Sequence, residues 1–135
     1  MENIPEGFAP LFRTSPYLEL LGPIYGKDTS NGIVVGVMAQ EKHCNARQSV
    51  HGGVFSSLAD IALGYNAAFS GKDPVAMVTA SLTIDYAGSA KLGDWIEIET
   101  DVQKVGRKMA FANCYFVVGS KRIVHASGVF TVLGE

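Results

Sequence analysis

The chain has 135 residues, the size of one domain with a single hydrophobic core. Its composition, 47% hydrophobic and 18% charged, is that of a globular protein with few surface charges, which mildly favours an oligomer. A net charge of −2 argues against a nucleic-acid partner, and no apolar run reaches the roughly 18 residues of a membrane span.

The N-terminal sequence and the two cysteines indicate in which cellular compartment the protein is expected. The first twelve residues have no basic stretch before their apolar residues, whereas a secretory signal would have one. Cys44 and Cys114 stand in no paired or metal-type spacing. We therefore expect reduced thiols and a cytoplasmic protein.

The sequence contains no repeat or linker, so residues 1–135 are expected to form one domain, with 1–15 as an N-terminal lead. This lead is expected to be a short helix or irregular, and to be closed by Pro16. Residues 17–25 could form a first strand, and 32–39 are predicted to form a second.

Residues 53–69 carry the only long helical pattern. One stripe is predicted to face the core: Val54, Leu58, Ile61, Ala62 and Tyr65. A second face consists of small residues and one acid: Ser56, Ser57, Asp60, Gly64, Ala67 and Ala68. Small side chains would let another backbone or a ligand come close to this face.

Four strands are predicted after the helix, at 75–86, 95–104, 109–118 and 122–133. In the first of them the even positions are apolar, and strict alternation sets Thr79 on the opposite face. One central helix and a long antiparallel sheet give an α+β layout, with the helix lying on one face of the sheet.

Asp60 is the only charged side chain between Gly52 and Ser70. Burying an ionised carboxylate without partners is costly, so its position needs a reason. One reason is chemistry, because a partly desolvated Asp can act as a general base on water or as a nucleophile. The alternative is that Asp60 faces solvent on one side of a buried helix.

Gly52 and Gly53 are predicted to open the helix, where backbone N–H groups are unpaired and attract negative charge. Such groups can form an oxyanion site, although a Gly-Gly pair can also serve backbone conformation alone. Gly52 and Asp60 are eight residues apart, roughly 12 Å along a helix axis. A two-fold dimer with antiparallel helices could therefore complete two shared sites.

Four features together resemble a known family: Asn45, the His51-Gly52-Gly53 triplet, Asp60, and a strand reading VTASLTIDYAGSAKLGD. The sequence resembles the hotdog-fold acyl-CoA thioesterases of the phenylacetate-degradation type over about residues 15–133. The resemblance implies a hotdog fold, in which a curved antiparallel sheet wraps a long helix. It also implies dimers that often pair into tetramers.

The resemblance assigns roles to residues of this chain. It makes Asp60 the base or nucleophile, and it places the Gly52 N–H on the thioester carbonyl. Asn45 would position the carbonyl or the water, and His51 would be an orienting residue. Thr79 stands where some relatives have a helper Ser.

Coenzyme A carries phosphates that need cations, and neither this chain nor the family has a P-loop. The expected contacts are Lys91, Arg107 and Lys108, although basic turn residues also serve solubility. Gly53 is expected to contact the substrate. Gly88 stands where relatives often have proline, which affects the local loop.

The sequence therefore predicts an acyl-CoA thioesterase that hydrolyses an aryl- or medium-chain acyl-CoA without a cofactor. The three histidines are too scattered to suggest a metal site. The alternatives are a hotdog hydroxyacyl-thioester dehydratase and a non-catalytic acyl-CoA-binding protein. Four aromatic residues could line an acyl tunnel or simply pack in the core: Phe55, Tyr65, Phe69 and Tyr86.

Overall fold

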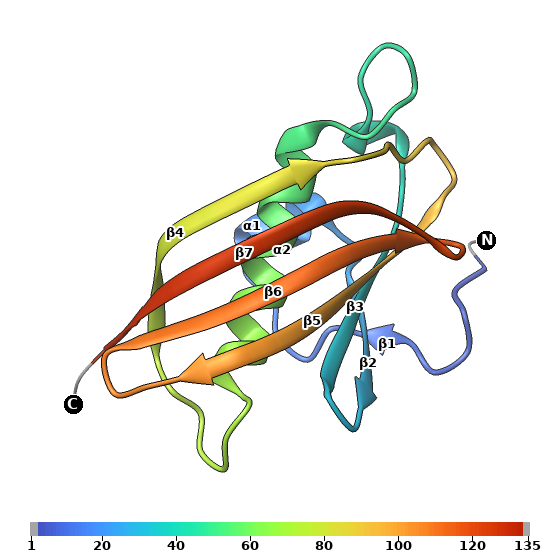
Figure 1. Ribbon diagram of the computed structural model, residues 1–135. Coiled ribbons are helices and arrows are strands. Elements are labelled where there is room, and N and C mark those ends of the chain that lie inside the picture. The colour runs from blue at the N-terminus through green and yellow to red at the C-terminus, as the bar shows by residue number, and fades with distance from the viewer. Residues whose placement is uncertain (1–2, 134–135) are drawn as a thin grey trace.

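A curved antiparallel sheet wraps one long helix in the computed structural model, which describes residues 3–133 (Figure 1). The ends of the predicted domain, 1–2 and 134–135, lie outside the described residues. Along the sheet the strand order is β1-β2-β3-β5-β6-β7-β4. The strands are β1 Ala9–Pro10, β2 Tyr25–Thr29, β3 Gly32–Met38, β4 Met77–Tyr86, β5 Trp95–Val105, β6 Met109–Val118 and β7 Lys121–Val132. The predicted α+β hotdog architecture is confirmed.

The prediction of a first strand at 17–25 is wrong, because this stretch begins with the short helix α1, Pro16–Leu21. The Ser15 hydroxyl accepts a hydrogen bond from the Leu18 N–H, as a helix N-cap does. Pro16 begins the helix instead of closing the lead, since its fixed φ suits the first helical turn.

The long helix α2, Gly52–Ala68, has a buried face that differs from the predicted stripe. Val54, Ile61 and Tyr65 are only half-buried, whereas Ala59 and Leu63 are fully buried. The sheet wraps so far around α2 that small side chains can also face it. Most of the predicted small-residue face, Asp60 included, remains half-buried.

β4 is the edge strand of the sheet, and a β-bulge interrupts its alternation. Thr79 pairs with Phe130 and Ser81 pairs with Val129, so Ala80 is an extra residue between two consecutive pairs. Met77 and Thr79 before the bulge therefore face the same side as the apolar residues after it, Leu82 and Ile84. The prediction of strict alternation over 75–86, with Thr79 on the face opposite to the apolar residues, is wrong because of this bulge.

Asn66, near the end of α2, fastens the helix to the second predicted strand. Its Oδ1 accepts from the Ile33 N–H at 2.9 Å, and its Nδ2 donates to the Ile33 and Ala62 carbonyls. Asn66 is 4% exposed, so each of these polar groups is satisfied inside the protein. No helix of the described chain is long and apolar enough to span a bilayer.

Candidate active site

Asp60 projects from the middle of α2 toward β4. Its Oδ1 accepts a hydrogen bond of 2.6 Å from the Thr79 hydroxyl, which the bulge turns toward the helix. The bond has the length of a strong, charge-assisted contact and orients the carboxylate. Oδ2 has no hydrogen-bond partner among residues 3–133, so it remains available to a water or a substrate.

A cavity of about 580 Å³ opens beside Asp60 and Thr79. Its walls are largely apolar and include Ile61, Gly64, Tyr65, Phe69, Met77 and Phe130. The half-buried acid thus lies in the wall of a space that suits an apolar group. A larger cavity of about 820 Å³, between the β2–β3 turn and β5, is also lined by Tyr65 and Phe69 but contains none of the predicted catalytic or phosphate-binding residues.

The four aromatic residues that could line an acyl tunnel lie in three different places in the structure. Tyr65 and Phe69 line the cavity beside Asp60. Phe55 is a core residue, 2% exposed, and packs edge-on against Phe116. Tyr86 lies at the start of α2, where its hydroxyl donates to the Gly52 carbonyl at 2.8 Å.

The start of α2 presents two exposed glycines. Neither the Gly52 nor the Gly53 N–H has an acceptor within the described chain, and a Cβ added at Gly53 would meet nothing within 4 Å. A Cβ at Gly52 would approach the Tyr86 hydroxyl to 3.2 Å. Two unpaired N–H groups at a helix N-terminus suit an oxyanion. Tyr86 supports this end of the helix, a role that no sequence motif indicated.

His51 precedes the helix as its N-cap residue. Its backbone N–H donates to the His43 carbonyl at 2.9 Å, and its carbonyl accepts from the Val54 N–H. The His51 side chain is exposed and makes no capping hydrogen bond.

Asn45 organises the loop before α2. Its Oδ1 accepts from the Arg47 N–H at 2.9 Å and from the Ser49 N–H at 3.2 Å. The side-chain oxygen is thus committed to the loop, and Nδ2 is the group left to donate outward. Lys91 lies beside this loop, through a β-bridge to Ser49.

The predicted site residues therefore fall into two groups within one chain. Asn45, His51, Gly52, Gly53 and Lys91 gather at the start of α2, and Asp60 and Thr79 form the second group. Since α2 is unbroken, these groups are roughly 12 Å apart along its axis.

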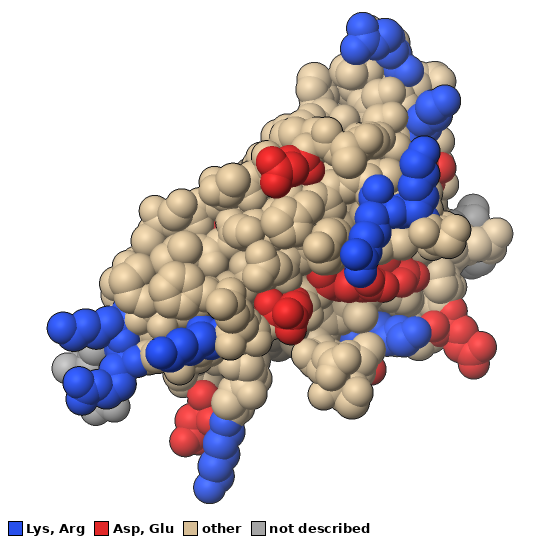
Figure 2. All heavy atoms as spheres, in the orientation of Figure 1, with Lys and Arg blue, Asp and Glu red and all other residues tan. Residues whose placement is uncertain are grey.

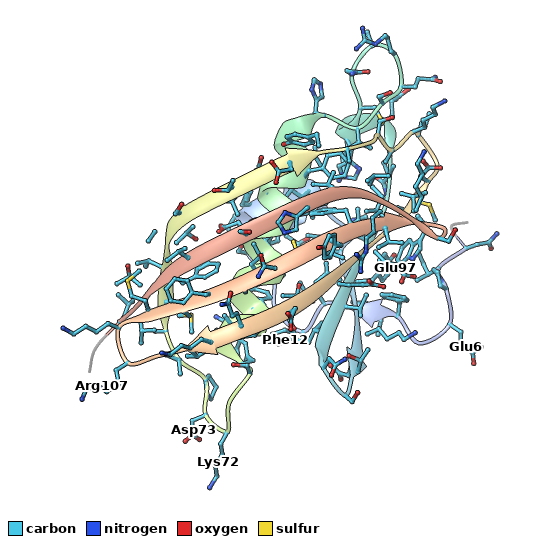
Figure 3. The ribbon with its side chains drawn as sticks, in the orientation of Figure 1. Glu6, Phe12, Lys72, Asp73, Glu97 and Arg107 are labelled. Atoms are coloured by element: carbon cyan, nitrogen blue, oxygen red, sulfur yellow. The ribbon has the colours of Figure 1, made fainter. Side chains whose placement is uncertain are left out.

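Arg107 and Lys108 form the turn between β5 and β6, far from the loop before α2 (Figure 1). Arg107 is labelled at this corner in Figure 3, and basic side chains gather there in Figure 2. The Lys108 carbonyl accepts from the Val132 N–H, which fixes the turn against the end of β7. The three predicted phosphate contacts do not come together in one chain.

The two cysteines are free, and neither is poised as a nucleophile. Burial raises the pKa of the Cys114 thiol to about 12. Burial, and then the nearby Glu41 carboxylate, raise the pKa of Cys44. Thiolate, the reactive form, is therefore scarce at neutral pH. Within residues 3–133 no cluster of His, Cys, Asp or Glu could hold a metal ion.

Sequence comparisons identify relatives over most of the chain. The family described as "Thioesterase superfamily" matches residues 48–124, more than half of the chain. A Pseudomonas aeruginosa protein named "Putative esterase" is 49% identical over 131 residues, covering 96% of this chain and 98% of the relative.

Solved structures share the fold. The crystal structure of zebrafish thioesterase superfamily member 2 has a TM-score of 0.80 and 27% identity, covering 89% of this chain and 88% of that chain. The Escherichia coli PaaI protein, from the phenylacetic acid degradation operon, has a TM-score of 0.70 and 27% identity, covering 76% and 72%. The chain thus belongs to the thioesterase superfamily and is a thioester hydrolase with the hotdog fold.

Proposed function

We propose that the protein hydrolyses acyl-CoA thioesters to a free acid and coenzyme A. The observation that carries this proposal is the Asp60–Thr79 pair in the wall of a largely apolar cavity. An acyl group would lie in the cavity, with its thioester carbonyl beside the carboxylate. Two unpaired N–H groups at the start of a helix supply the complementary oxyanion site.

The reaction would proceed through attack on the thioester carbonyl carbon. Asp60 would take a proton from water as the water oxygen attacks, or it would attack directly and form an anhydride that water then opens. The Gly52 N–H, with the Asn45 Nδ2 beside it, would stabilise the oxyanion. The carbon–sulfur bond then breaks, and coenzyme A leaves as a thiolate that takes up a proton.

The two groups of site residues would meet across a two-fold dimer. About 12 Å along α2 separates Gly52 from Asp60 within one chain, so one carbonyl cannot contact both. Asp60 and Thr79 of one protomer would face Asn45, Gly52 and Gly53 of its partner. We propose this homodimer, paired again into a dimer of dimers, as the active form.

The remaining parts of the substrate are assigned by chemistry. Lys91, beside the Asn45 loop, is the proposed phosphate contact at the helix start, with Arg107 and Lys108 as contacts from elsewhere in the assembly. An aryl- or medium-chain acyl group suits the aromatic walls of the cavity, and the structurally similar PaaI protein comes from a phenylacetic acid degradation operon. Two free thiols support a reducing compartment, the cytoplasm.

A dehydratase of the same fold is the second candidate, and it would use a histidine paired with an acid. The His51 side chain is exposed and has no acidic partner among the described residues. His125 does lie 3.4 Å from Asp85, but neither of these two residues lines the cavity beside Asp60. Asp60 is paired with a threonine instead. This arrangement favours hydrolysis over dehydration.

Thiol release from a panel of acyl-CoAs tests the proposed function. We expect turnover of aryl or medium-chain members, and Asp60→Asn should lower kcat by at least about a hundredfold while the fold and oligomer persist. Circular dichroism and gel filtration provide the folding control. Absence of thiol release over the whole panel, or near-normal turnover by the folded variant, would contradict the proposal. An acyl-CoA sensor would bind the panel without releasing thiol.

A further inference from the structure

We infer that Arg13 recognises a carboxylate at the far end of the acyl group, so that the preferred substrates are ω-carboxyacyl-CoAs. This inference rests on the proposed function and deepens it. Arg13 lines the same cavity as Asp60, although the two residues come from distant parts of the chain. The cavity therefore has an acid in one part of its wall, a cation in another, and apolar side chains between them.

Arg13 is held above two aromatic rings, that of Tyr65 in α2 and that of Phe69 at the C-cap of this helix. Its guanidinium carbon lies 6.0 Å from the ring centroid of Tyr65 and 5.9 Å from that of Phe69, within the range of cation–π contacts. The neighbouring Phe12 packs against the same two rings, at 5.4 and 5.1 Å between centroids. These contacts anchor the lead segment, and with it Arg13, to the second half of the helix.

The Arg13 guanidinium has no anionic partner in the described part of the chain. The ion pair found there joins His125 to Asp85, on two other strands. No hydrogen bond of the Arg13 guanidinium occurs within residues 3–133 either. Contact with a ring face leaves the N–H groups at the guanidinium edge free, and their fork matches a carboxylate. The cation beside the cavity thus lacks the partner that the ligand would supply.

Spacing along α2 sets the length of the acyl group. Tyr65 and Phe69 follow Asp60 by five and nine residues, roughly 8 and 13 Å of helical rise. An acyl group with its carbonyl at Asp60 and its other end at Arg13 would cross this distance beside apolar walls. The negative charge of Asp60 would disfavour the reverse orientation, with the carboxylate at the reacting end. The substrate class is therefore a medium-length dicarboxylic acid with one end thioesterified.

The test compares two acyl-CoAs of equal carbon number, one with a terminal carboxylate and one with a terminal methyl group. We expect the wild type to prefer the carboxylate by at least about tenfold in kcat/KM, the scale of one exposed charge-assisted contact. Arg13→Gln should remove most of this preference, mainly by raising KM for the carboxylated substrate. Arg13→Lys keeps the charge and should retain part of it. Lys72→Gln, an exposed lysine of the loop after α2, is the matched control and should keep the wild-type ratio.

The outcomes separate this inference from the proposed function. If the methyl-ended substrate is hydrolysed but the preference is absent, or survives in folded Arg13→Gln, the inference is overturned and the thioesterase proposal stands. If Arg13→Gln lowers kcat/KM equally for both substrates, Arg13 has a structural role and the inference is also overturned. If neither substrate nor any other acyl-CoA releases thiol, the proposed function and this inference fail together.

Discussion

The hydrogen bond between Thr79 and Asp60 joins a polar edge-strand residue to the only acid of α2. A threonine at this position can donate through its hydroxyl while its methyl group contacts the apolar wall. This hydrogen bond stabilises and orients the carboxylate, and the second carboxylate oxygen stays available on the side of the cavity. Serine could make the same hydrogen bond, and alanine could not.

Thr79→Ala should lower kcat about tenfold, because one hydrogen bond to a charged group is worth about 1.5 to 3 kcal/mol and water replaces part of it. Thr79→Ser should restore most of the rate. Thr83→Ala, an exposed position on the same strand, is the control. Initial rates with one acyl-CoA measure the effect, and a Thr79→Ala enzyme as fast as the control would show that the hydroxyl does not assist Asp60.

Some residues of the candidate site can be identified from the sequence, and others cannot. Asp60 could be found because no other charge occurs on its helix, and Gly52 because glycines precede a helical pattern. Arg13 and Tyr86 make their contacts with residues more than thirty positions away; no motif surrounds Arg13, and the motif around Tyr86 does not indicate its hydrogen bond to Gly52. Such contacts depend on how distant elements pack, which local patterns do not encode.

The segments that lead into α2 are joined by one buried histidine. His43 is 2% exposed and ends the short 3₁₀ helix η1, Glu41–His43. Its Nδ1 accepts from the Gln40 N–H, so Nε2 carries the proton and donates to the Leu21 carbonyl at 2.6 Å. Its backbone carbonyl accepts from the His51 N–H. His43 therefore connects α1, η1 and the start of α2.

His43→Ala should lower the free energy of unfolding by about 2 to 4 kcal/mol, since the backbone groups of half-buried Gln40 and Leu21 lose their hydrogen bonds to the ring and a cavity opens in its place. Urea unfolding followed by circular dichroism measures the change. Glu41→Ala, an exposed substitution in the same short helix, should change it by less than about 0.5 kcal/mol. Equal stability of the two variants would mean that the histidine is not needed to join these segments.

Regular periodicity predicted some elements better than others. The predicted bounds of β5, β6 and β7 agree closely with the structure, although a register shift interrupts the pairing of β5 with β6 and another that of β6 with β7. The apolar spacing over 17–25 favours a strand, but the capping signal of Ser15-Pro16 specifies a helix, and the helix α1 forms. In β4 the bulge leaves the strand in place but changes which face each residue occupies.

At the scale of the whole molecule, each chain carries its two groups of candidate site residues at different positions along one unbroken helix. β4 lies at the edge of the sheet, so its outer backbone groups are available for pairing. We propose that two chains meet there by two-fold symmetry, with their α2 helices antiparallel. Each Asp60 would then face the helix start of the partner.

Mixed dimers test this sharing of sites. Asn45→Ala and Asp60→Ala homodimers should each be nearly inactive, since every site lacks one residue. Unfolding and refolding the two variants together at equal amounts makes about half of the dimers mixed, each with one intact site. Activity should recover to about a quarter of the wild type refolded in the same way. If mixed dimers demonstrably form and activity stays at the level of the parents, Asp60 serves its own chain.

The bulge at Ala80 has a consequence for insertions and deletions in this strand. Ala80 is the residue without a partner on β7, because Thr79 and Ser81 pair with the consecutive residues Phe130 and Val129. Deleting Ala80 would therefore give a regular strand in which Thr79 still faces Asp60 and Tyr86 still faces Gly52. A second deletion would have no unpaired residue to remove, so one part of β4 would turn to the opposite face and one of these two contacts would be lost. The strand can thus lose one residue at the bulge and no more, unlike a surface loop.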